Sequence, residues 1–156
     1  SSPRVINVVS GGMYSESLNI EELIVPDTDA YSGSVAYARQ KRALMVLTQE
    51  WAAEWESEGI VVNAMHPGWA DTPGVRSALP QFRKITKHVL RSSEEGADTI
   101  VWLAVATEAG SVSGKLFLDR AEHAAHLVNK TRETRQETEK LMRFLASKRL
   151  SADVVQ

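Results

Sequence analysis

The run RVINVV at residues 4–9, which ends in the turn residues SGG at 10–12, decides the fold prediction. It is short and β-branched and has no helical period, so it suits a buried strand of a parallel sheet. After a loop at 13–33, a helical pattern runs from about residue 34 to 57, and a second β-branched run, IVVNAM, occupies 60–65. Strand, helix and strand in this order form a βαβ unit, which implies a parallel sheet with a right-handed crossover.

The sequence beyond this unit predicts three more elements. Ser92, with Glu95 three positions later, is a capping box that opens a helix reaching about Ala106. The run KLFLD at 115–119 predicts a third strand. A charge-alternating stretch with a narrow apolar stripe, at about 131–149, predicts a peripheral helix. We therefore expect an α/β fold.

The composition excludes several classes of function. The chain has 156 residues, of which 43% are hydrophobic, so it can build one sizeable core. The formal net charge of −2, with alternating signs, predicts no nucleic-acid partner. The lack of cysteine excludes disulfides and Cys-ligated zinc. With no signal peptide and no apolar run near about 20 residues, we expect no transmembrane segment and a cytoplasmic location. The β-rich run begins almost at Ser1, which favours a cut through a larger protein.

Tyr37 and Lys41 lie one turn apart on the predicted helix, so their side chains project from the same face. A nearby ammonium favours the ionised form of a tyrosine, which can then exchange a proton near neutral pH. The alternative is an incidental pair on an amphipathic helix, and YxxxK alone is a weak signal. Its surroundings strengthen it, because Ser10 follows one strand and Pro67 and Gly68 follow the next. Such positions share the carboxyl edge of a parallel sheet, where α/β folds bind ligands.

Three segments in this order, RVINVVSGGM, YARQK and HPGWADTP, resemble the short-chain dehydrogenase/reductase superfamily over about residues 4–120. More narrowly, HPGWADTPGV, EEGADTIVWLA and SGKLFLDR resemble an orphan group of that superfamily called dehydrogenase/reductase member twelve. The resemblance implies a partial Rossmann-type doubly wound parallel sheet, strands 5–7 of the family fold, without the N-terminal nucleotide-binding half. It divides the chain into a catalytic half at residues 1–120 and a peripheral helical tail at 121–156.

The resemblance also implies roles for individual residues. Ser10 would hold the substrate oxygen, Tyr37 would be the acid/base, and Lys41 would stabilise its phenolate and hydrogen-bond the nicotinamide ribose. The cofactor-binding residues would be Tyr37, Lys41, Pro67, Gly68, Ala70 and Thr72. Tyr37 follows Ser10 by 27 positions, a spacing that fits the retinol-dehydrogenase-like members, whose loop is extended here.

The phosphate-binding part of the family pattern does not occur in this sequence. None of the nine glycines forms G-x-x-x-G-x-G or G-x-G-x-x-G, and the family's active-site asparagine is also missing. A Rossmann domain binds the cofactor pyrophosphate at such a segment. The resemblance implies NAD or NADP as the cofactor, with no preference between them, because the residue that distinguishes the two follows a strand that this sequence lacks.

Two weaker sequence patterns can each be explained without a functional role. Asp119, His123 and His126 are spaced like metal ligands but lack a fourth group, so we expect no metal site. An apolar stripe at residues 75–89 is either core or a lid over a lipid-like carbonyl. Its members are Val75, Leu79, Phe82, Ile85 and Val89.

The sequence thus predicts an NAD(P)-dependent oxidoreductase that interconverts a carbonyl and an alcohol. Its substrate would be a small molecule, with an apolar or lipid-like compound as one interpretation. Trp51 and Trp55, one helical turn apart, either pack internally or form the contact of a homo-oligomer. The alternative function is a catalytically inactive truncated fragment or isoform that acts only through subunit association. The intact Ser10, Tyr37 and Lys41 favour the enzyme for a parent protein, whereas the alternative is the safer expectation for this chain by itself.

Overall fold

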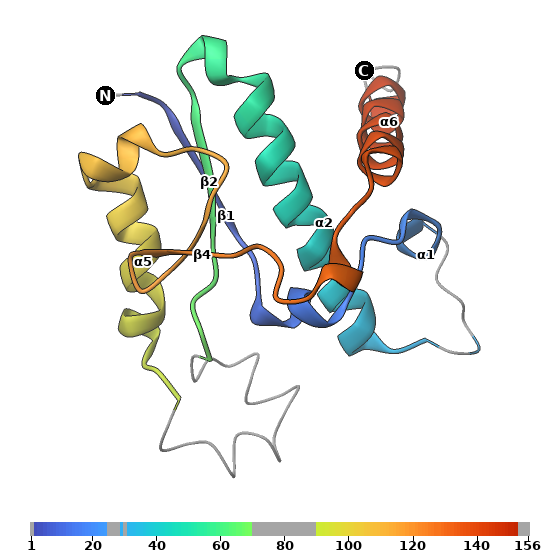
Figure 1. Cartoon of the computed structure of the whole chain (residues 1–156), viewed down its shortest axis with the longest axis horizontal. Coiled ribbons are helices and arrows are strands. Elements are labelled where there is room, and N and C mark those ends of the chain that lie inside the picture. The colour runs from blue at the N-terminus through green and yellow to red at the C-terminus, as the bar shows by residue number, and fades with distance from the viewer. Residues whose placement is uncertain (1, 25–28, 30, 70–89, 153–156) are drawn as a thin grey trace. The chain divides into compact units, whose positions relative to one another are not determined.

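The computed structural model describes residues 2–24, 29, 31–69 and 90–152. With η marking 3-10 helices, its elements are β1 (Arg4–Val8), η1 (Gly11–Ser15), α1 (Ile20–Ile24), α2 (Gly33–Glu54), η2 (Glu56–Glu58), β2 (Val61–Met65), α5 (Ser93–Val105), η3 (Glu108–Ser111), β3 (Leu116–Leu118), β4 (Ala121–His123), η4 (Asn129–Thr131) and α6 (Arg135–Ala152) (Figure 1). The chain divides into two compact units: the first contains Ser1–Gly11 and Thr48–Ala124, and the second Gly12–Leu47 and Ala125–Gln156.

The first unit is built on a four-stranded sheet in the order β1-β2-β3-β4. β1 pairs in parallel with β2, in a register that runs from Arg4↔Val61 to Val8↔Met65. β2 pairs in parallel with β3, so the three predicted strands are neighbours. This topology confirms the predicted α/β fold with a parallel sheet, and it places β1 at one edge of the sheet.

α5 and the C-terminal part of α2 cover opposite faces of this sheet (Figure 1). Ile6 of β1 packs against the core that contains Met65 of β2 and Leu103 of α5. The next residue, Asn7, faces the other way, because successive side chains of a strand alternate. Its Nδ2 donates a hydrogen bond of 2.9 Å to Thr48 Oγ1 of α2. The sheet is thus covered by helices on both faces.

The helix boundaries follow local signals in the sequence. Ser92 Oγ accepts the Glu95 N–H at 3.2 Å, and Glu95 Oε2 accepts the Ser92 N–H at 2.7 Å, which confirms the predicted capping box of α5. The helix predicted at 34–57 is observed as α2 followed by the short η2. It ends at Gly59, whose φ of 71° lies in the left-handed region that favours glycine.

Two elements differ from the prediction. β4 pairs antiparallel with β3, and the turn between them consists of Asp119 and Arg120, with φ of 53° and 58°. Hairpin turns of this kind usually contain Asn-Gly or Asp-Gly, so the sequence carried no clear signal for it. The stretch 13–33, predicted as a loop, contains most of η1 and all of α1. Asn19 Oδ1 caps α1 by accepting the Glu22 N–H at 3.2 Å; a helix this short shows no apolar period.

The second unit contains the predicted tail helix. α6 begins at Arg135, a few residues after the expected start, because Thr134 and Glu137 form a reciprocal cap. Thr134 Oγ1 accepts the Glu137 N–H at 3.3 Å, and Glu137 Oε2 accepts the Thr134 N–H at 2.7 Å. Lys140 of this helix pairs with Glu21 of α1 at 3.2 Å. The expected domain division at residue 120 stays a prediction.

Candidate active site

Tyr37 and Lys41 lie on the same face of α2 in the second unit, as their spacing predicts. Lys41 Nζ is 5.6 Å from the centroid of the Tyr37 ring, a distance at which a cation interacts favourably with an aromatic face. Tyr37 is 50% exposed, whereas Ala38 and Arg42 of the same helix are buried. The pair therefore stands on an accessible face of a helix whose other face is packed.

Arg42, with 0% of its surface exposed, anchors α2 within the second unit. Its Nε and Nη2 donate to Met13 O at 3.2 and 2.9 Å, and its Nη1 donates to Ala125 O at 2.9 Å. Glu133 Oε1 lies 3.6 Å from Arg42 Nε and compensates its charge. The fork of guanidinium donors thus ties α2 to η1 and to the segment before η4.

His126 joins this buried group through Glu133. His126 Nε2 is 3.0 Å from Glu133 Oε2, and its Nδ1 is 3.3 Å from Thr131 Oγ1. Burial raises the pKa of Glu133, and burial, followed by the charge of Arg42, lowers the pKa of His126. Both shifts have one main cause, the cost of a charge away from water. Arg42, Glu133 and His126 are called the Arg42 cluster below.

Ser10 follows β1 at the carboxyl edge of the sheet in the first unit, where it is partly buried. The Val9 N–H donates to Met65 O at 2.8 Å, which keeps the end of β1 beside the end of β2. A Cβ atom placed on Gly11 would lie 4.0 Å from His66 Cε1. The residues that follow β1 therefore meet those that follow β2, as expected for parallel strands.

Residues 66–68 form a turn directly after β2. Gly68 has a φ of 71°, and its N–H donates to His66 Nδ1 at 3.3 Å. A Cβ atom on Gly68 would lie 2.9 Å from Arg91 Nε, so both the backbone angle and the space favour glycine. Pro67 and Gly68 are both partly buried. The turn with Pro67 and Gly68 thus lies at the same sheet edge as Ser10.

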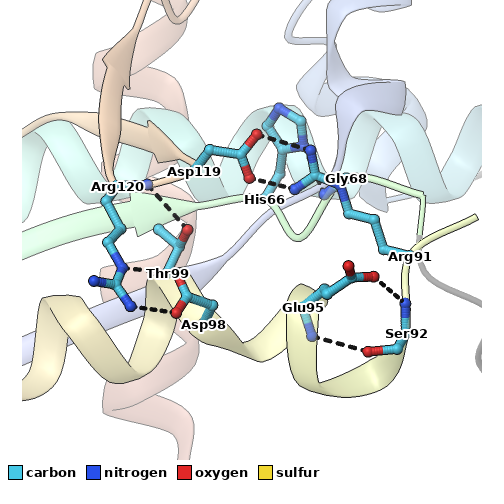
Figure 2. Close-up of polar contacts among 9 residues, drawn as sticks. All are labelled: His66, Gly68, Arg91, Ser92, Glu95, Asp98, Thr99, Asp119 and Arg120. Atoms are coloured by element: carbon cyan, nitrogen blue, oxygen red, sulfur yellow. Dashed lines mark hydrogen bonds and ion pairs between the residues drawn. The ribbon is translucent and has the colours of Figure 1, made fainter.

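Two arginine–carboxylate ion pairs lie near this edge of the sheet, and Arg91 of the first pair adjoins the turn (Figure 2). The Arg91 guanidinium donates two hydrogen bonds to the Asp119 carboxylate, of which Nη2–Oδ2 is 2.7 Å. Arg120 pairs in the same way with Asp98, with Nε–Oδ2 at 2.7 Å. Each arginine holds the pKa of its carboxylate below the usual range. An open depression beside them is lined by Arg91, Glu94, Glu95, Asp98 and Asp119. Its lining is charged, unlike that of an apolar ligand pocket.

The predicted site residues are divided between the two units. Ser10, Pro67 and Gly68 belong to the first unit, and Tyr37 and Lys41 belong to the second. The approach of Ser10 to Tyr37 therefore stays a prediction. Ala70, Thr72 and the apolar stripe at 75–89 lie outside the described residues.

Two absences apply to the described part of the chain. Within it, no three His, Cys, Asp or Glu side chains are grouped so as to hold a metal ion. None of its helices combines the length and the apolar character needed to cross a membrane.

Sequence reasoning missed two arginines of these clusters. Arg42 follows Ala38 by four positions and precedes Met45 by three, on the buried face of α2. That helical spacing was the available signal. Arg91 stands directly before the capping box, and its partner Asp119 follows β3 at the carboxyl edge. Nothing in the local sequence pairs these two residues.

The enoyl-(acyl carrier protein) reductase family model matches residues 24–119. Human "Dehydrogenase/reductase SDR family member 12" is 43% identical over 145 residues, which cover 92% of this chain and 45% of the human protein. Mouse retinol dehydrogenase 14 is 33% identical over 129 residues, 78% of this chain and 38% of the mouse protein. This chain spans less than half the length of these curated relatives.

The fold also matches solved structures. The angucycline C-6 ketoreductase solved with bound NADP superposes on 73% of this chain and 40% of its own, with a TM-score of 0.54 and 24% sequence identity. The family model covers more than half of the chain, and the parallel order of β1, β2 and β3 agrees with it. The chain therefore belongs to the short-chain dehydrogenase/reductase family.

Proposed function

We propose that this chain supplies the catalytic half of an NAD(P)-dependent oxidoreductase, in which Tyr37 exchanges a proton with the oxygen of a carbonyl or alcohol substrate. The observation that carries the proposal is the geometry of the Tyr37–Lys41 pair. The Tyr37 ring is 50% exposed, and the Lys41 ammonium lies 5.6 Å from its centroid. Membership of an oxidoreductase family supports the general class of reaction.

Each residue of the pair would act through its own chemistry. During carbonyl reduction Tyr37 would donate its hydroxyl proton to the substrate oxygen, and during alcohol oxidation it would accept that proton. Lys41 would stabilise the phenolate by its positive charge and would donate a hydrogen bond to a ribose hydroxyl. Ser10 would donate its hydroxyl hydrogen bond to the substrate oxygen. The bound nicotinamide would supply or accept the hydride.

We propose that Lys41 and the Pro67–Gly68 turn contact the nicotinamide end of the dinucleotide. Lys41 offers a donor for the ribose, and the Pro67–Gly68 turn offers backbone at the carboxyl edge, where a glycine allows close approach. The sequence offers no comparable residues for the pyrophosphate end of the cofactor, because it lacks a Gly-rich phosphate-binding motif. We propose that this end binds outside the chain, and the proposal covers NAD and NADP alike.

For the substrate we propose a small apolar carbonyl or alcohol. The similarity to a protein named retinol dehydrogenase 14 supports this class. The 27-position spacing of Ser10 and Tyr37 supports it further, because that spacing resembles the retinol-dehydrogenase-like members. A panel of aldehydes of increasing chain length, assayed with NADH and NADPH, would define the class.

The test is a comparison of tyrosine variants in the whole protein. Tyr37→Phe removes only the hydroxyl and keeps the ring, so kcat for carbonyl reduction should fall by about 10²–10⁴-fold, with a much smaller change in cofactor affinity. Lys41→Ala should lower kcat and weaken cofactor binding together. Tyr31→Phe is the matched control, since it removes the hydroxyl of another exposed tyrosine and should leave kcat as it is. Near-normal turnover in Tyr37→Phe would contradict the mechanism.

The alternative function is an inactive fragment or isoform that acts through subunit association. Within the described residues β1 pairs on one side only, and its Val8 is 39% exposed; such edges recruit other strands. The Trp51 and Trp55 rings stack with centroids 5.4 Å apart, which suits packing or a subunit contact. A folded protein that forms dimers by light scattering, but shows no turnover that depends on Tyr37, would favour this alternative.

A further inference from the structure

His66 lies at the ends of β1, β2 and β3 in the first unit. It follows β2 directly, and its backbone N–H donates to Phe117 O of β3 at 3.1 Å. Its ring is partly buried, and Cε1 lies 4.0 Å from the point where a Gly11 Cβ would be. The ring therefore has a defined place beside the first residues after β1.

The His66 ring holds the following turn by a hydrogen bond. The Gly68 N–H donates to His66 Nδ1 at 3.3 Å. Nδ1 can accept this bond only when it carries no proton, so the bond requires the neutral ring. In the protonated ring both nitrogens are donors, and Nδ1 would direct a hydrogen toward the Gly68 N–H.

Arg91 packs against the same turn (Figure 2). Its Nε lies 2.9 Å from the point where a Gly68 Cβ would be, so the guanidinium stem fills the space beside Gly68. The two hydrogen bonds to Asp119 keep Arg91 in this position. His66 thus accepts a hydrogen bond from the Gly68 N–H, and Arg91 occupies the space beside the Gly68 Cα.

The surroundings of His66, taken together, favour its neutral form. The ionisable groups that face it are Arg91 just before α5, Asp119 after β3 and His123 on β4. Burial lowers the pKa of His66 below its ordinary value, and His123 and Arg91 lower it further, against the opposing effect of Asp119. The neutral ring therefore predominates at neutral pH and is lost only as the pH falls below about 6.5.

We propose that His66 is a positioning residue whose neutral ring holds the Pro67–Gly68 turn in the conformation that meets the nicotinamide end of the cofactor. The inference rests on the proposed function, because it requires that this turn contact NAD(P)H. Cofactor affinity should therefore fall when the ring gains a proton.

The test measures the dissociation constants of NADH and NADPH for the whole protein, from about pH 5 to about pH 8. His66→Asn keeps an acceptor for the N–H two residues on, as in an Asx-turn, but does not titrate. His66→Phe keeps a ring and removes the acceptor. In the wild type, affinity should fall about fivefold as His66 gains its proton, the scale of one hydrogen bond. His66→Asn should bind within about twofold of the wild type at pH 8 without that step, and His66→Phe about fivefold more weakly at every pH.

His123→Asn is the matched control, because it removes a neighbouring imidazole that makes no hydrogen bond to Gly68 in the described structure. It should keep a pH step of the wild-type size, displaced toward higher pH because His123 lowers the pKa of His66. All variants should unfold at similar temperatures at pH 8. Two results would overturn the inference and leave the proposed function standing: a wild-type dissociation constant that does not change between about pH 5 and about pH 8, or a His66→Asn variant whose dissociation constant still changes with pH as in the wild type. Failure of the wild type to bind either cofactor at any pH would reject the proposed function, and the inference with it.

Discussion

Replacing Arg42 with methionine removes a charge and its donors from a fully buried position while keeping a side chain of similar length. Met13 O and Ala125 O would each lose a donor at 2.9 Å, and Glu133 would lose its compensating cation. Removing one partner of a buried ion pair costs about 3–5 kcal/mol. We expect the free energy of unfolding to fall by that amount, a large part of the about 5–15 kcal/mol of a typical domain.

Urea denaturation followed by circular dichroism measures this loss, and three further variants locate its cause. Arg42→Lys keeps the charge but not the fork of donors, so it should recover only part of the stability. Adding Glu133→Gln to Arg42→Met removes the unpaired carboxylate and should also recover part of it. Arg135→Met is the matched control, since Arg135 pairs with Glu139 at a side chain that is 81% exposed, and it should change stability little. If Arg42→Met costs no more than Arg135→Met, the reasoning from burial is wrong.

Two further predictions concern the Gly68 turn and the Arg42 cluster. Gly68 and Gly59 both have a φ of 71°, where a side chain costs about 1–2 kcal/mol. Of these two glycines, only Gly68 would place a Cβ close to another residue, 2.9 Å from Arg91 Nε. In urea denaturation Gly68→Ala should therefore lower the free energy of unfolding more than Gly59→Ala does. Equal losses would show that the Arg91 side chain can move aside at no cost. The pKa of His126 lies below its ordinary value, so its contribution to stability is present above about pH 6.5 and is lost as the pH falls. His126→Asn should flatten that part of the pH profile of unfolding, and an unchanged slope would assign the dependence to another group.

The sequence by itself determined the local structure and the placement of Tyr37 and Lys41 on one helix face. The β-branched runs at 4–9 and 60–65 predicted β1 and β2 because β-branched side chains are restricted at χ1 in a way that favours extended backbone. The Ser92–Glu95 capping box was predictable because its two partners are three positions apart. Tyr37 and Lys41 share a face because the helical period alone places them there. Each of these features depends on a short stretch of chain.

Only the tertiary structure decided which charges are buried and what they contact. Arg42 binds Met13 and Ala125, which lie 29 and 83 positions away. Arg91 meets Asp119 across 28 positions. A charge can be buried only where donors and acceptors converge on it, because the loss of hydration must be offset by new partners. That convergence depends on the packing of segments distant in sequence, and it cannot be predicted from periodicity and spacing within one segment.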